Sequence, residues 1–119
     1  MPGSRKLGSE AEDRAAEYLL ELGYSLVGRR LKFSSGEIDV AAYDNDVLVI
    51  VEVKSTQGHY APESRITDQK ISRLARATRE FVAAYDLQPN GIRFDVIVVS
   101  PRGIEHYREA YEDSGASEY

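Results

Sequence analysis

The sequence contains no cysteine, which excludes disulfides, thiolate metal sites and cysteine nucleophiles. This absence is compatible with a reducing cytoplasm, the compartment that we expect for the chain. No apolar run is long enough to cross a bilayer, and the first ten residues lack the apolar segment of a secretion signal. We therefore expect a soluble cytoplasmic protein that does not contact a membrane.

Basic residues are outnumbered by acidic ones, and the formal net charge is −5. This balance argues against a simple polycation that coats nucleic acid. Four acidic residues and no basic residue lie in 109–119, so the rest of the chain carries a net charge of only −1. Because no repeat or linker composition interrupts the sequence, we predict one domain over residues 1–108 and a disordered acidic tail over 109–119.

Hydrophobic spacing predicts a helix that ends at Gly23 as its C-cap, and a second helix capped by Thr67 with Ile66 and Ile71 as a hydrophobic staple. In order, the predicted elements are a helix over 10–22, a strand over 25–31, a hairpin over 36–54, a loop over 55–66, a helix from 67 to about 84, a strand over 92–99 and a short edge strand over 103–107. This order indicates an α/β fold, a mixed α+β sheet flanked by helices.

A hairpin with charges at its open end is predicted by the stretch GEIDVAAYDNDVLVIVEVK. If residues 45–46 form the turn, Asp39 lies directly opposite Glu52, and Glu37 lies opposite Lys54. The β-carbons of the opposed carboxylates would then be roughly 5 Å apart, and like charges in that position are destabilising. A raised carboxylate pKa, the nearby Lys54 or a divalent cation could offset the repulsion. A solvated strand end with a few salt bridges is the simpler alternative.

Glu12 lies on or beside the apolar face of the first predicted helix, where an unpartnered charge is costly. Ser9 stands three residues earlier, so the pair could form a capping box at the helix start. Alternatively, the helix crosses the sheet and brings Glu12 to Asp39 and Glu52 around a metal ion. The sequence leaves both roles open, and they are compatible with each other.

Basic residues gather in two segments, which are either solvated surfaces or contacts for phosphates. They are Arg29, Arg30 and Lys32 before the first turn, and Arg65, Lys70, Arg73, Arg76 and Arg79 along the second helix and just before it. We interpret His59 and His106 as surface residues. Arg93 and Asp95 share a strand face, and we interpret them as structural residues that pair with each other or with other charged groups.

The hairpin resembles the metal-binding core of the PD-(D/E)xK nuclease superfamily, which includes restriction endonucleases and Holliday junction resolvases. Asp39, Glu52 and Lys54 match its D…ExK signature. The fuller pattern is similar to the YraN-like family of small bacterial proteins over residues 8 to 108. The residues that carry this likeness are Gly8, Ala11, Glu12, Ala15, Tyr18, Leu19, Gly23, Tyr24, Lys70, Arg93, Phe94 and Asp95. Thr56 departs from the family's usual arginine, which puts one substrate contact in doubt.

The resemblance implies a restriction-endonuclease-like core of order αβββαβ(β) and a nuclease that hydrolyses phosphodiester bonds, with DNA of particular structure as the expected partner. It implies Mg²⁺ or Mn²⁺ as the cofactor, and a homodimer is compatible with such a fold. The implied catalytic residues are Asp39, Glu52 and Lys54; the metal ligands are Glu12, Asp39, Glu52 and the Val53 carbonyl; the nucleic-acid contacts are Arg29, Arg30, Arg65, Lys70 and Arg73. The alternatives are a nucleic-acid-binding protein of this fold with little or no catalysis, and a metal-independent protein-interaction domain.

Overall fold

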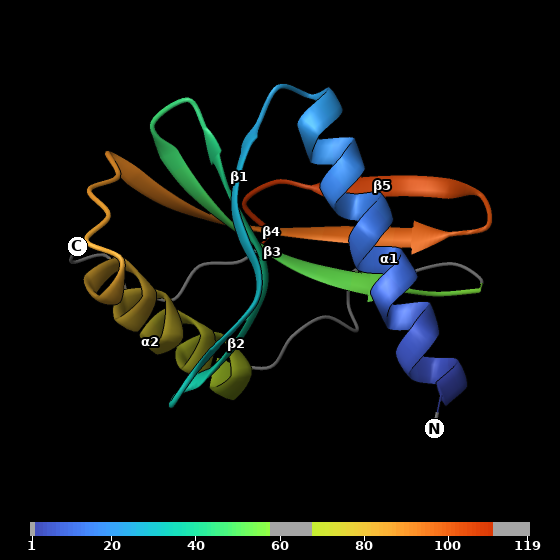
Figure 1. Ribbon diagram of the computed structural model, residues 1–119, viewed down its shortest axis with the longest axis horizontal. Helices are drawn as coiled ribbons and strands as arrows, with labels where there is room; N and C mark the ends of the chain where they lie inside the picture. The colour runs from blue at the N-terminus through green and yellow to red at the C-terminus, as the bar shows by residue number, and fades with distance from the viewer. Residues whose placement is uncertain (1, 58–67, 111–119) are drawn as a thin grey trace.

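The computed structural model describes residues 2–57 and 68–110. Its elements are α1 (Pro2–Glu21), β1 (Ser25–Phe33), β2 (Gly36–Asp44), β3 (Val47–Ser55), α2 (Asp68–Ala84), β4 (Gly91–Ser100) and β5 (Gly103–Tyr107). The strands form one sheet in the order β1-β2-β3-β4-β5, in which β3 and β4 are parallel and the other neighbours are antiparallel. The predicted mixed α/β fold is therefore confirmed, with both helices flanking the sheet (Figure 1).

The two helices cover opposite faces of the sheet, and β3 contributes to both cores. Leu48 and Ile50 pack in the cluster that contains α2, whereas Val49 and Val51 pack in the cluster that contains α1. All four side chains are buried. A central strand that is covered on both faces needs apolar residues at successive positions, and β3 has them. The charged residues that follow, Glu52 and Lys54, come where this apolar run ends.

Helix α1 confirms one predicted end and corrects the other. Gly23 adopts a φ of 96°, its N–H donates to the Leu20 carbonyl, and the Tyr24 N–H donates to the Leu19 carbonyl. This is the Schellman arrangement, which favours glycine because its φ is positive. The predicted N-cap at Ser9 is wrong, since α1 begins at Pro2 and Ser9 lies inside the helix.

Several sequence predictions fall outside the described residues. They concern His59, Arg65, Ile66, Thr67 and the segment 111–119. Two residues of the predicted tail are described: Glu109 N–H donates to the Asp95 carboxylate, and Ala110 N–H donates to the Phe94 carbonyl. Among the residues that the structure describes, neither helix has the length and apolarity that a membrane span requires.

Candidate active site

The end of β3 carries the first part of the site. Because side chains alternate along a strand, Glu52 and Lys54 share the face of Ile50, toward α2. Glu52 Oε2 lies 3.1 Å from Lys70 Nζ on α2 and 3.6 Å from Lys54 Nζ. The side chain of Glu52 is only 12% exposed, so two lysines neutralise a largely buried carboxylate. The predicted common face of Glu52 and Lys54 is confirmed.

Asp39 enters the site from β2. The β2–β3 pairing follows the predicted register from Asp44–Val47 to Val40–Val51 and ends there. The expected backbone pairs of Asp39 with Glu52 and of Glu37 with Lys54 are therefore not formed. Instead, Asp39 Oδ2 accepts a hydrogen bond of 2.9 Å from the Val53 N–H. A carboxylate thus takes the place of a carbonyl acceptor as the two strands separate.

The strands separate where the alternation of faces in β2 is interrupted. Ile38 and Ala41 pack with the α2 cluster, whereas Val40 packs with the α1 cluster. A regular strand would place Ile38 and Val40 on the same face. On β1, Arg30 lies between the residues that pair with Val40 and Ile38, and it has a φ of 53°, which non-glycine residues rarely adopt. Both strands are irregular at the level of Asp39.

Burial, followed by the negative charge of Glu52, raises the pKa of Asp39 to about 7, although the hydrogen bond from the Val53 N–H opposes them. Smaller contributions in the same direction come from Glu12 and Glu37. Three other acidic side chains therefore raise the pKa of Asp39. Of the responses to carboxylate repulsion that the sequence left open, two are present: a raised pKa on Asp39 and a lysine close to Glu52.

Glu12 reaches this region from α1 and ends among arginines of β1. Its Oε1 accepts a 2.7 Å hydrogen bond from Arg30 Nε and lies 4.0 Å from an Arg29 nitrogen. Arg29 makes its shorter contact, 2.6 Å, with Asp13. The hydrogen bond to Glu12 raises the pKa of Arg30. The basic run of β1, predicted to contact phosphates, thus pairs with carboxylates of α1 in this structure.

The donor set suits a hard divalent cation in kind, because carboxylate oxygens are the ligands that such ions prefer. Its arrangement is different: among residues 2–57 and 68–110, no three acidic or histidine side chains converge as a ready metal site. Each expected ligand has another partner. Glu12 binds Arg30, Glu52 binds Lys70, and Asp39 accepts from Val53. A cation could use these oxygens only after some of those contacts exchange.

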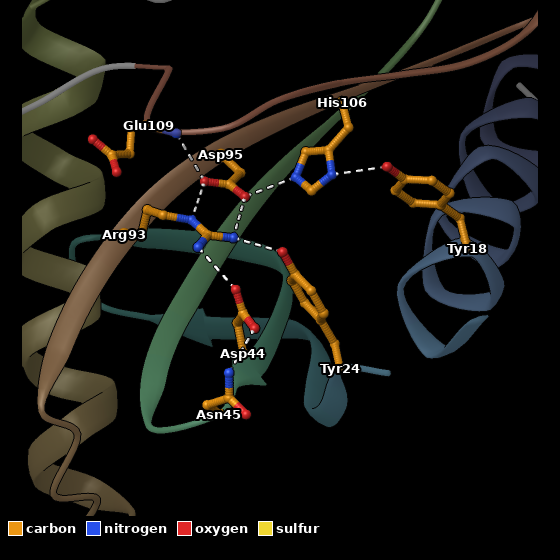
Figure 2. Close-up of polar contacts among 8 residues, drawn as sticks. All are labelled: Tyr18, Tyr24, Asp44, Asn45, Arg93, Asp95, His106 and Glu109. Atoms are coloured by element: carbon orange, nitrogen blue, oxygen red, sulfur yellow. Dashed lines mark hydrogen bonds and ion pairs between the residues drawn. The ribbon is translucent and has the colours of Figure 1, made fainter. Parts of the chain in front are cut away.

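A second polar cluster lies on the α1 face of the sheet, as Figure 2 shows. Asp95 is fully buried on β4 and accepts two hydrogen bonds of 3.0 Å from the Arg93 guanidinium. His106 Nε2 lies 2.7 Å from Asp95 Oδ2, and His106 Nδ1 lies 3.0 Å from the Tyr18 hydroxyl. A carboxylate needs a donor, so Nε2 carries the proton and Nδ1 accepts from Tyr18.

Arg93 extends the same cluster to two further elements. Its guanidinium lies 3.0 Å from Asp44 at the hairpin turn and 2.7 Å from the Tyr24 hydroxyl at the start of β1. Burial alone would raise the pKa of Asp95, but hydrogen bonds from His106 and Arg93 hold that pKa below its ordinary value. The predicted pairing of Arg93 with Asp95 is confirmed. This cluster joins α1, the hairpin, β4 and β5.

The interpretation of His106 as a surface residue is wrong, because its side chain is 5% exposed. The residue pairs with Ile97 across β4 and β5, which places it beside the α1 core. The alternation of side chains along β5 indicates the burial of His106 only weakly, because the strand has only five residues. Tyr18 is part of the family pattern. Its hydrogen bond to His106 joins residues 88 positions apart, so no local pattern indicates it.

Comparison with known proteins gives the family. Residues 11–99 match the family described as "Uncharacterised protein family UPF0102". The chain is 42% identical over 100 residues to the UPF0102 protein STH1475 of Symbiobacterium thermophilum, covering 82% of this chain and 85% of the relative. It is 35% identical over 107 residues to a UPF0102 protein of Persephonella marina, covering 88% of this chain and 92% of the relative. The protein therefore belongs to UPF0102, the family whose pattern its sequence resembles.

Proposed function

We propose that this protein is a metal-dependent nuclease that hydrolyses phosphodiester bonds, acting on DNA of particular structure with little sequence specificity. The observation that carries the proposal is that Asp39 lies where β2 and β3 separate, with the negative charges of Glu52 and Glu12 acting on it and with Lys54 beside Glu52. Carboxylates from β3 and α1 thus act on a third carboxylate from β2 and, together with burial, raise its pKa. A purely structural cluster gains little from such repulsion.

The residues divide by role. Asp39, Glu52 and Glu12, together with the Val53 carbonyl, would hold Mg²⁺ or Mn²⁺. When bound, such an ion supplies charge neutralisation at the phosphate and a lowered pKa for a coordinated water. The Val53 N–H fixes one oxygen of Asp39, and the other oxygen would bind the ion. Lys54, 3.6 Å from Glu52, can orient the attacking water or stabilise negative charge on the phosphate.

The basic residues flank this cluster from two elements. Arg29 and Arg30 come from β1, and Lys70 and Arg73 come from the first turns of α2. Arg65, the remaining expected contact, lies outside the described residues. Side chains of this type grip phosphates without reading bases, which fixes the position of a nucleic acid but not its sequence. We therefore expect selection by the shape of the nucleic acid.

A cleavage assay tests the proposal directly. Wild-type protein with Mg²⁺ is expected to cut at least one of branched, flapped and single-stranded DNA, and EDTA should abolish cutting. Asp39→Asn and Lys54→Met should each lower the rate by about 100-fold or more, because each removes charge at the reacting phosphate. Glu17→Gln, an exposed α1 variant away from the cluster, is the matched control. Undiminished cutting by Asp39→Asn would refute the assignment.

A nucleic-acid-binding protein with little or no catalysis is the second candidate. The ion pairs of Glu12 with Arg30 and of Glu52 with Lys70 favour it, because they satisfy two of the expected ligands without a metal. Calorimetry separates the two functions. Binding of DNA without any binding of Mn²⁺ would support this candidate over the nuclease.

A further inference from the structure

Two of the expected metal ligands are held by cations in a similar way. Arg30 of β1 contacts Glu12 of α1 at 2.7 Å, and Lys70 of α2 contacts Glu52 of β3 at 3.1 Å. The carboxylates are 16% and 12% exposed, whereas the arginine and lysine side chains are 49% and 46% exposed. The cations therefore reach in from solvent. The exposed arginine and lysine side chains can move away at little cost, whereas the largely buried carboxylates stay in place.

These contacts compete with a divalent ion for the same oxygens. A guanidinium or ammonium group within 3.1 Å of a carboxylate oxygen occupies the approach that a metal needs. Ion pairs with an exposed partner stabilise a protein by about 1 kcal/mol or less, so a divalent ion can displace them. The displaced groups would remain beside the site on flexible stems, and guanidinium and ammonium groups are the usual ligands of phosphate oxygens.

The backbone of Arg30 supports a dedicated role for this side chain. Its φ of 53° places a non-glycine residue in the left-handed region, which costs on the order of 1 kcal/mol. The neighbouring Arg29 makes its shorter contact, 2.6 Å, with Asp13 and lies 4.0 Å from Glu12, so Glu12 has its closer partner in Arg30. Such a conformation persists only where surrounding contacts impose it. Here it directs Arg30 to Glu12, one of the expected metal ligands.

We propose that Arg30 and Lys70 are internal counterions that hold Glu12 and Glu52 without metal and move to nucleic-acid phosphates when a divalent ion binds. This inference rests on the proposed function and adds regulation of the same site. It follows that a metal ion that binds alone must displace two resident cations. When nucleic acid is also bound, each displaced cation can contact a phosphate instead. Because coupling between two ligands is reciprocal, each should raise the affinity of the other.

Calorimetric titration with Mn²⁺ tests the inference in the full chain. Without nucleic acid, Arg30→Gln and Lys70→Gln are expected to bind Mn²⁺ about three- to tenfold more tightly than wild type. Arg14→Gln and Arg79→Gln remove the same charge from exposed positions of α1 and α2 and are expected to stay within about twofold. The titration is then repeated with a single-stranded DNA oligonucleotide present. The oligonucleotide should increase the Mn²⁺ affinity of wild type and increase it less in Arg30→Gln and Lys70→Gln.

The possible results separate the two proposals. Equal effects of Arg30→Gln and Arg14→Gln, or an unchanged affinity in Arg30→Gln, would overturn the counterion role while leaving metal binding intact. A wild-type protein that binds no Mn²⁺ would overturn the proposed function and this inference with it. A second measurement does not depend on any variant folding. The Arg30 Nε–H resonance of ¹⁵N-labelled wild type should shift on addition of Mg²⁺, and an unmoved resonance at saturating Mg²⁺ would contradict the exchange.

Discussion

Replacing Asp39 with asparagine is expected to stabilise the metal-free protein above neutral pH, although the same change should abolish cleavage. The aspartate carries a charge in a buried position, and Glu52 repels that charge. Asparagine keeps the shape and the oxygen that accepts the Val53 N–H, but it removes the charge. Stability and function should therefore change in opposite directions at this residue.

The magnitude follows from the two pKa values of Asp39, 3.8 in an unfolded chain and about 7 in the folded protein. Between these values the folded state holds a proton that the unfolded state has released. Stability therefore falls as pH rises from about 4 to 7, and the cost is complete above about 7. The difference corresponds to at most about 4 kcal/mol. Because Asp39 is not fully buried, water screens part of this cost, and we expect about 2 kcal/mol.

Urea unfolding of wild type and Asp39→Asn in EDTA, at pH 5 and pH 8, measures the effect. The variant should exceed wild type by about 2 kcal/mol at pH 8 and by less than half of that, about 0.8 kcal/mol, at pH 5. Mg²⁺ at pH 8 should stabilise wild type but not the variant, since a ligand stabilises only the state that binds it. Glu17→Gln serves as the control for removal of an exposed charge. Parallel pH profiles of wild type and Asp39→Asn would refute the reasoning.

Two further predictions concern the cluster of Figure 2. Asp95→Asn should destabilise the protein by about 3 kcal/mol at pH 7, because it removes a buried negative charge that is paired with the Arg93 guanidinium. The pKa of Asp95 is lowered by folding, so its stabilisation is present above pH 4 and is lost as pH falls further; urea titrations at pH 7 and pH 3 should show the variant's deficit shrinking. His106→Ala should cost about 2 kcal/mol, since it deprives Tyr18 and Asp95 of partners, whereas Tyr107→Phe on the same strand should cost less in thermal unfolding. Equal losses in His106→Ala and Tyr107→Phe would contradict the role given to His106.

Local sequence patterns predicted the features that local physics determines. The unbroken apolar run of β3 indicated a central strand, and Gly23 indicated the end of the first helix. The start of that helix was missed because Pro2, Gly3 and Gly8 are poor helix formers, and a better cap at Ser9 followed them. The register of the hairpin was right up to Val40 and wrong beyond it, since the irregularity at Asp39 depends on β1 as well as on the hairpin itself.

The partners of the site residues could not be predicted, because they depend on elements distant in the sequence. Glu12 was placed near the carboxylates, but nothing in its neighbourhood indicates Arg30, which lies 18 residues away on a different element. The same separation joins Glu52 to Lys70. Charged side chains are long and solvated, so many pairings satisfy the same pattern. The fold decides between them, and it also decided that His106 is buried.

The two polar clusters are connected through α1, and this connection explains why a buried charge network stands on the far face of the sheet from Glu52. Tyr18 fixes α1 to His106, and Glu12 lies six residues earlier on the same helix, a rise of about 9 Å. Between them, Ala15 packs fully buried in the α1 core. A contact made by a small alanine side chain allows a helix to shift along its axis. A hydrogen bond to an oriented imidazole prevents that shift. The Asp95 cluster thus fixes the depth at which α1 presents Glu12, and a weaker Mn²⁺ affinity in His106→Ala, in a protein that still folds, is the expected consequence.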